Sequence, residues 1–124
     1  MKIFIDDIRV PPNDTWHIAR SVGAAIRALD QFCLEVTDIQ LDHDISHQVV
    51  MGGMSRPYPC AETFESVARY IVRLKEVYPD WNPTIRLHTS NPVGAKNMAA
   101  ILQDAGLESE TQIAGGANRL EMQL

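Results

Sequence analysis

The chain has 124 residues, of which 45% are hydrophobic and 22% are charged, and its formal net charge is -5 at pH 7. This length and composition fit one globular domain spanning residues 1–124, with a core that needs neither disulfides nor a structural metal. The negative charge excludes a strong nonspecific affinity for nucleic acid or an anionic membrane. A phosphorylated ligand is still allowed, because a metal ion or a local group of donors can reverse the field.

The first predicted element is a short buried strand. The apolar run Ile3–Ile5 ends abruptly at Asp6-Asp7, so this strand would carry two acids at its carboxyl end. The Pro-Pro-Asn-Asp segment at 11–14 predicts a loop and argues against a helix directly after the first strand. A second short strand is predicted at Trp16–Ala19.

A helix and a third strand are predicted next. Ser21 is a favourable N-cap, and apolar residues follow it at helical spacing: Val22, Ala25, Ile26 and Leu29. The third strand is predicted at Val36–Leu41, and its end is again polar, at Asp42-His43-Asp44.

A segment rich in Gly and Pro predicts a loop through Gly52-Gly53 and residues 57–59. A long helix is predicted from Ala61 to about Tyr78, because its apolar residues form one stripe: Phe64, Val67, Ala68, Ile71, Leu74 and Val77.

The fourth predicted strand, Thr84–Leu87, ends at the polar group His88-Thr89-Ser90-Asn91. Pro92 then stands at a natural first helical position with Asn91 as its cap. This last helix should run to about Ala105.

Gly106 should stop that helix, and a final strand is predicted near Thr111–Ala114. The order β, β, α, β, α, β, α with a final strand predicts an α/β sandwich around a mostly parallel sheet of four or five strands.

The two cysteines, Cys33 and Cys60, lack the spacing of a metal site or a disulfide framework, which favours a reducing cytoplasm. The sequence also contains no apolar run near the roughly 20 residues that span a bilayer. We therefore expect a cytoplasmic protein without a membrane partner, and the sequence leaves its oligomeric state open.

Three predicted strands end in polar clusters, and ligands of parallel sheets bind outside the carboxyl ends of the strands. Four carboxylates gathered there would repel one another and need a cation: Asp6, Asp7, Asp42 and Asp44. Mg²⁺ or Mn²⁺ suits such oxygen ligands and leaves positions for phosphate oxygens. The alternative is that these acids only cap helices or turns in water.

The pleat places Asp42 and Asp44 on the same side of the third strand, so either could bind the ion. His43 and His88 are candidate metal ligands or general acid/base groups, because imidazole titrates near neutral pH. The alternative for each histidine is a structural hydrogen bond to a backbone carbonyl.

Candidate phosphate-binding residues lie nearby. Ser90 and Asn91 stand where a helix begins, and backbone N–H groups there can hold an anion. Arg9 and Lys96 are the cations nearest the clusters in sequence and could pair with a phosphate. Solvation or pairing with acids is the alternative for both cations.

Three motifs resemble one family, the cyclic-phosphate-processing receiver-like domain. They are residues 3–9 with Pro11-Pro12, residues 41–45 and residues 88–94, and the resemblance extends from Met1 to about Leu102. It implies a flavodoxin-like, receiver-type fold. It also implies that Asp6 and Asp7 bind the metal, that Asp42 is the better match to the phosphoryl acceptor, and that Thr89 or Ser90 supplies a hydroxyl.

The chain also departs from classical receivers. A proline loop replaces the helix after the acid pair, and the lysine after a fifth strand has no counterpart. His43, His88 and Asn91 are additions that suit hydrolysis better than storage of a phosphoryl group, which argues against a phosphorelay.

We therefore expect a metal-dependent phosphoesterase that acts on a cyclic nucleotide or a cyclic-phosphate end, with an aspartyl-phosphate at Asp42 as a variant. The alternative is a non-catalytic, receiver-like module that binds a nucleotide or a protein partner in a regulatory role.

Overall fold

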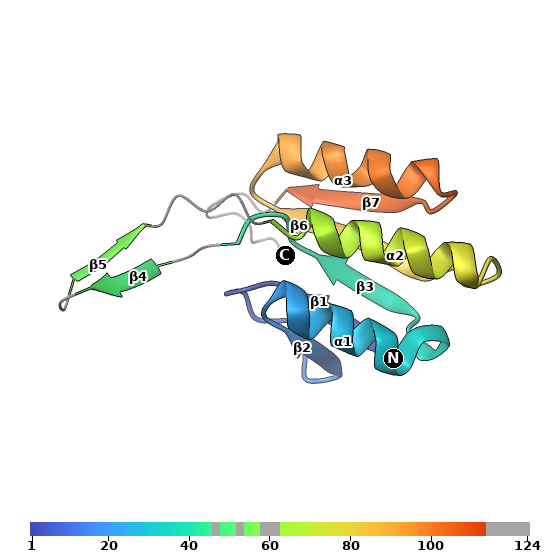
Figure 1. The fold of residues 1–124 in the computed structure, drawn as a ribbon, viewed down its shortest axis with the longest axis horizontal. Coiled ribbons are helices and arrows are strands. Elements are labelled where there is room, and N and C mark those ends of the chain that lie inside the picture. Colours follow the sequence, from blue (N-terminus) through green and yellow to red (C-terminus); the bar gives the residue numbers. More distant parts are fainter. Residues whose placement is uncertain (46–47, 52–53, 58–62, 114–124) are drawn as a thin grey trace.

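A computed structural model describes residues 1–45, 48–51, 54–57 and 63–113. Its main sheet has five parallel strands in the order β2-β1-β3-β6-β7 (Figure 1). The strands are β1 (Lys2–Ile5), β2 (Trp16–Ala19), β3 (Asp38–Leu41), β6 (Thr84–Thr89) and β7 (Ser109–Ile113). This sheet confirms the predicted α/β class with a flavodoxin-like, receiver-type arrangement.

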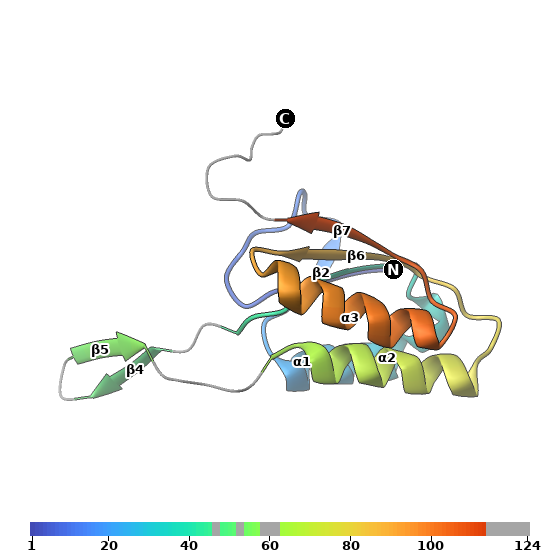
Figure 2. The same cartoon turned by 90° about the horizontal axis from the view of Figure 1, so that it is seen from above.

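Three helices cover the sheet, and Figure 2 shows all of them on one of its faces. They are α1 (Val22–Phe32), α2 (Glu65–Val77) and α3 (Pro92–Asp104), with a short 3₁₀ turn, η1 (Cys33–Glu35), after α1. In the row of helices, α2 contacts both α1 and α3. The buried core therefore lies between this row and one face of the sheet.

Chain topology explains why the helices share a face. The connections that contain α1, α2 and α3 all advance in the same direction across the sheet, so right-handed crossovers place them on the same side. The connection from β1 to β2 runs in the opposite direction, and a helix there would cover the other face. The chain has the predicted proline loop at this place instead, between Ile5 and Trp16.

The helix ends agree with the predicted caps. The Ser21 side chain accepts a hydrogen bond from the Ala24 N–H, and the Asn91 side chain accepts one from the Gly94 N–H. Pro92 is the first residue of α3, and Gly106, with φ of +80°, follows the end of that helix.

Several boundaries differ from the predicted ones. Helix α2 begins at Glu65, whereas the prediction began at Ala61, which lies outside the described residues. Strand β3 begins at Asp38, two residues after the predicted start. Strand β6 continues to Thr89, two residues beyond the predicted end, and β7 begins at Ser109 rather than near Thr111.

The predicted loop after the third strand is wrong over its central part. Strands β4 (Gln48–Met51) and β5 (Met54–Pro57) pair antiparallel, with Met51 opposite Met54. Figure 1 shows this hairpin beyond the carboxyl ends of the main sheet. In sequence the two strands are separated only by Gly52-Gly53, and such a dipeptide between strands favours a tight hairpin.

No helix within the described residues is long and apolar enough to cross a membrane.

Candidate metal and phosphate site

Three carboxylates meet at the carboxyl edge of the sheet. Asp6 and Asp7 follow β1, and Asp42 follows β3, which pairs with β1 so that Ile5 lies opposite Leu41. One oxygen of each carboxylate lies within 4.8 Å of the other two. Asp6 is 2% exposed and Asp42 is 3% exposed. Among the described residues, these three acids therefore form a group that could hold a metal ion.

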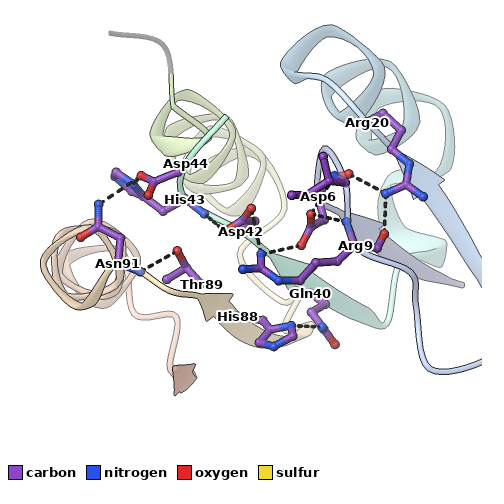
Figure 3. Close-up of polar contacts among 11 residues, drawn as sticks. Asp6, Arg9, Arg20, Gln40, Asp42, His43, Asp44, His88, Thr89 and Asn91 are labelled. Carbon is purple, nitrogen blue, oxygen red and sulfur yellow. Dashed lines mark hydrogen bonds and ion pairs between the residues drawn. The ribbon is translucent and has the colours of Figure 1, made fainter. Parts of the chain in front are cut away.

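Arg9 joins the two buried acids of this group. Its Nη1 atom lies 3.2 Å from Oδ2 of Asp6 and 3.3 Å from Oδ2 of Asp42 (Figure 3). The other oxygen of Asp6, Oδ1, accepts hydrogen bonds from the backbone N–H groups of Ile8 and Arg9, at 3.0 and 2.9 Å. One guanidinium therefore supplies part of the positive charge that the three acids need.

Arg20 fixes the backbone that carries Arg9, and sequence reasoning missed it. Its Nη1 atom donates to the backbone carbonyls of Asp6, at 3.2 Å, and Arg9. Ala19 accepts a hydrogen bond from the Asp6 N–H, so β2 ends beside the acid pair. A basic residue directly after the second predicted strand could have indicated this role, because neighbouring parallel strands end at the same edge of the sheet.

Asp42 is held in an environment that disfavours its ionised form. Burial and then the negative charge of Asp6 raise the pKa of Asp42 to about 6. A hydrogen bond from the His43 backbone, the charge of Arg9 and a hydrogen bond from Thr89 oppose this rise only partly. A divalent cation among these oxygens would stabilise the ionised form, so the donor set fits Mg²⁺ or Mn²⁺.

A second polar network lies beside the first and is centred on His43. Its Nδ1 atom lies 2.6 Å from Oδ1 of Asp44, and its Nε2 atom lies 2.7 Å from Oε2 of Glu65. Asn91 donates to the same Asp44 oxygen at 3.1 Å. Glu65 begins α2 and Asn91 caps α3, so this network ties β3 to the starts of two helices.

The two carboxylates favour the charged form of His43. Burial would lower its pKa, but the hydrogen bonds to Glu65 and Asp44, and then the charges of these acids, raise the pKa above its usual value. For Asp44, burial would raise the pKa, but hydrogen bonds from His43 and Asn91 and the His43 charge lower it. The network therefore holds the His43 ring between two carboxylates, with both ring nitrogens bonded and its charged form favoured.

His43 also packs tightly against α3. An added Cβ at Gly94 would lie 2.4 Å from Cγ and Nδ1 of the His43 ring. Glycine is required here by this close approach, because any larger side chain would displace the ring.

Thr89 and His88 are neighbours in β6 and point to opposite faces of the sheet, because the strand is pleated. Thr89 is fully buried on the helix side, where its hydroxyl accepts the Asn91 N–H at 3.1 Å and hydrogen-bonds Asp42. His88 points to the opposite face, where its Nδ1 atom lies 2.9 Å from Nε2 of Gln40. Ser90 is exposed. Of the two candidate hydroxyls, Thr89 is therefore the one beside the acid group.

The structure thus divides the predicted site residues among three groups. Asp6 and Asp42 lie with Arg9, Asp44 is directed to His43 and Asn91, and His88 lies with Gln40 (Figure 3). Asp7 belongs to the first group through its distance to Asp6 and Asp42. Asp42 is therefore better placed than Asp44 to join the acid pair.

Sequence reasoning missed Gln40 and Glu65 as well as Arg20. Gln40 lies within the predicted third strand, where a polar side chain in a buried strand is unusual and could have indicated a role. Glu65 lies in the first turn of α2, where an acid is expected for helix stability alone.

The fold, with an acid pair after the first strand and an acid after its neighbour, defines a receiver-type α/β domain. Comparison with known families agrees, since the model of the cyclic-phosphate processing receiver domain matches residues 1–104. The chain belongs to this family. No curated protein and no solved structure matches the chain.

Proposed function

We propose that this protein is a metal-dependent phosphoesterase that acts on a cyclic nucleotide or a cyclic-phosphate end. The observation that carries the proposal is the meeting of Asp6, Asp7 and Asp42, with Asp42 buried and its pKa raised to about 6. Such a group is unfavourable by itself and becomes favourable with a divalent cation. Membership of a family of cyclic-phosphate processing domains supports the class of substrate.

Asp6, Asp7 and Asp42 would hold the ion. A divalent ion at these ligands supplies a Lewis acid for a phosphoryl oxygen and lowers the pKa of a bound water. Asp6 is prepared for this role because two backbone N–H groups and Arg20 fix its carboxylate and its loop. Thr89 orients Asp42 from the other side through its hydroxyl.

His88 is the proposed proton carrier. Its Nδ1 atom lies 2.9 Å from Nε2 of Gln40, which orients the ring, and an imidazole is the side chain used most often for general acid/base catalysis. His43 has both ring nitrogens bonded to carboxylates, and we assign it a positioning role that keeps Asp42 and the start of α3 in place. In the first turn of α3, the proposed backbone donor to a phosphate is the Val93 N–H, because Pro92 has no N–H and the Gly94 N–H donates to the Asn91 side chain.

The test is turnover with a panel of 2′,3′-cyclic and 3′,5′-cyclic nucleotides and oligonucleotides with a cyclic-phosphate end, in Mg²⁺ or Mn²⁺. We expect Asp6→Asn to lower the rate by about a hundredfold or more, because it removes a metal ligand. Asp104→Asn, at the exposed end of α3, is the matched control and should retain the full rate. Absence of turnover with every substrate and both metals would refute the proposal.

His88→Gln tests the proton carrier separately. General acid/base groups contribute about 10²- to 10⁴-fold, so we expect a loss in that range and loss of one limb of the pH–rate profile. An unchanged profile would remove His88 from the mechanism and leave the metal site as proposed.

A regulatory binding module is the second candidate, and the bridging contacts of Arg9 favour it. Because Arg9 already pairs with Asp6 and Asp42, the fold has a partial counter-ion for these acids without any metal. In a binding module, Asp6→Asn and Asp42→Asn would retain nucleotide binding, as measured by calorimetry. In the phosphoesterase they would weaken metal-dependent binding.

A further inference from the structure

We infer that Arg9 is an exchangeable internal cation: a divalent ion displaces its guanidinium from Asp6 and Asp42, and the released guanidinium then binds the phosphate of the ligand. This inference rests on the metal site of the proposed function and adds a coupling between metal and phosphate binding. It assigns Arg9 two successive partners, the carboxylates first and the phosphate second.

Arg9 and a metal ion would compete for oxygens of the same two acids. The Oδ1 atom of Asp6 is bonded by two backbone N–H groups, and the Oδ1 atom of Asp42 accepts the His43 N–H at 2.7 Å. The remaining oxygen of each acid, Oδ2, is the one that Arg9 contacts. Oδ2 is thus the oxygen of each acid that accepts no backbone hydrogen bond, and a divalent ion that binds there would meet the guanidinium, whose like charge repels it.

The Arg9 side chain can move while its backbone stays in place. The Arg9 N–H donates to Asp6, and the Arg9 carbonyl accepts from Arg20. The side chain is 29% exposed, whereas those of Asp6 and Asp42 are 3% and 5% exposed. Arg9 therefore has solvent beside it into which its guanidinium can turn, and the buried acids do not.

The released guanidinium of Arg9 would find a new partner in the phosphate of the ligand. Divalent ions of this class retain coordination positions for phosphate oxygens, and a guanidinium can bind two phosphate oxygens at once. A phosphate bound to the ion would therefore give the Arg9 guanidinium an anionic partner in place of the carboxylates of Asp6 and Asp42. Each ligand should then raise the affinity for the other, as reciprocity of coupled binding requires.

The test is Mn²⁺ affinity, measured by calorimetry with and without inorganic phosphate, for the wild type, Arg9→Gln and Arg9→Lys. We expect Arg9→Gln to bind Mn²⁺ about tenfold more tightly in the absence of phosphate, because the competing charge is gone. Phosphate should tighten Mn²⁺ binding to the wild type but not to Arg9→Gln. Arg9→Lys retains the charge and should bind Mn²⁺ like the wild type.

Arg86→Gln is the matched control. Arg86 also contacts two acids, Asp38 and Glu110, but outside the acid group, so its loss should leave Mn²⁺ affinity unchanged. Circular dichroism checks that every variant is folded. In the wild type, the Nε–H NMR signal of Arg9 should shift on addition of Mg²⁺ and shift again on addition of phosphate.

Unchanged or weaker Mn²⁺ binding by Arg9→Gln would overturn the exchange, as would equal tightening by Arg9→Lys. Lack of Mn²⁺ binding by both the wild type and Arg9→Gln would overturn the exchange and the metal site together. Tighter binding by Arg9→Gln without any phosphoesterase turnover would support the exchange and reject only the proposed activity.

Discussion

The acid group and the His43 network are built alike, since each places one basic side chain between two carboxylates. Arg9 lies between Asp6 and Asp42, and His43 lies between Asp44 and Glu65. Their electrostatics nevertheless differ.

In the His43 network the carboxylates raise the pKa of the histidine and the histidine lowers that of Asp44, so the charges stabilise one another. In the acid group the pKa of Asp42 is raised, and Asp7 adds a third carboxylate. Similar arrangements of charged side chains therefore lower the pKa of the acid in one place, at Asp44, and leave that of a more deeply buried acid, Asp42, raised in the other. Balanced charge suits a structural tie, whereas unbalanced charge suits a binding site.

The largest expected effect concerns the pH dependence of stability at Asp42. A carboxyl whose pKa is raised from 3.8 to about 6 on folding binds its proton more tightly in the folded state. Without divalent ions, stability therefore falls as pH rises from about 4 to about 6, by on the order of 3 kcal/mol. Urea denaturation at several pH values, with a chelator present, should show this fall in the wild type.

Asp42→Asn is the control, because asparagine does not titrate. The difference in unfolding free energy between wild type and variant should change across this pH range, and Mg²⁺ at pH 7 should restore only the wild type. If the difference in unfolding free energy does not change with pH, the fold does not raise the pKa of Asp42, and the charges around Asp42 are as well balanced as those of the His43 network.

Gly94→Ala tests how rigid the His43 network is. The added methyl would lie 2.4 Å from the His43 ring, and both ring nitrogens are held by carboxylates. Overpacking of this kind destabilises by about 1–3 kcal/mol, and urea denaturation should show a loss in that range.

Gly23→Ala is the matched control in α1. A Cβ there meets only the end of the Arg27 side chain, at 3.2 Å, so the change should stabilise the helix by about 0.5–1 kcal/mol. Equal stability of Gly94→Ala and the wild type would show that the His43 ring can move aside.

Glu65→Gln should have the smallest effect. It keeps a hydrogen-bonding side chain beside Nε2 of His43 but removes the charge, so the pKa of His43 should fall. A raised histidine pKa stabilises the fold fully below pH 6.5, and this contribution is lost as pH rises through the folded-state pKa.

The variant should therefore be less stable than the wild type near neutral pH, by about 1 kcal/mol, and the difference should shrink at high pH. An NMR titration of the His43 ring checks the pKa directly. Glu76→Gln, exposed on the same helix, should leave that titration unchanged. If the pKa of His43 is the same in Glu65→Gln as in the wild type, Asp44 alone stabilises the charged form of His43.

Local patterns were enough to predict most elements of the sheet and helices. Apolar runs mark β1 and β3, and capping residues mark the starts of α1 and α3. The hairpin of β4 and β5 was missed although Gly52-Gly53 signals it, because the Gly- and Pro-rich surroundings favoured a loop. The extension of β6 to Thr89 was also missed, since polar residues at a strand end do not show where pairing stops.

By itself the sequence determined the fold class, the family motifs and the presence of acids after two neighbouring strands. These features depend on periodicity and on residues close together in the chain. Tertiary structure alone decided that Arg9 lies between Asp6 and Asp42, that Asp44 turns to His43, and that Glu65 closes the second network. The physical reason is that partners such as His43 and Glu65 lie 22 residues apart, and only the packing of helices on the sheet brings their charges together.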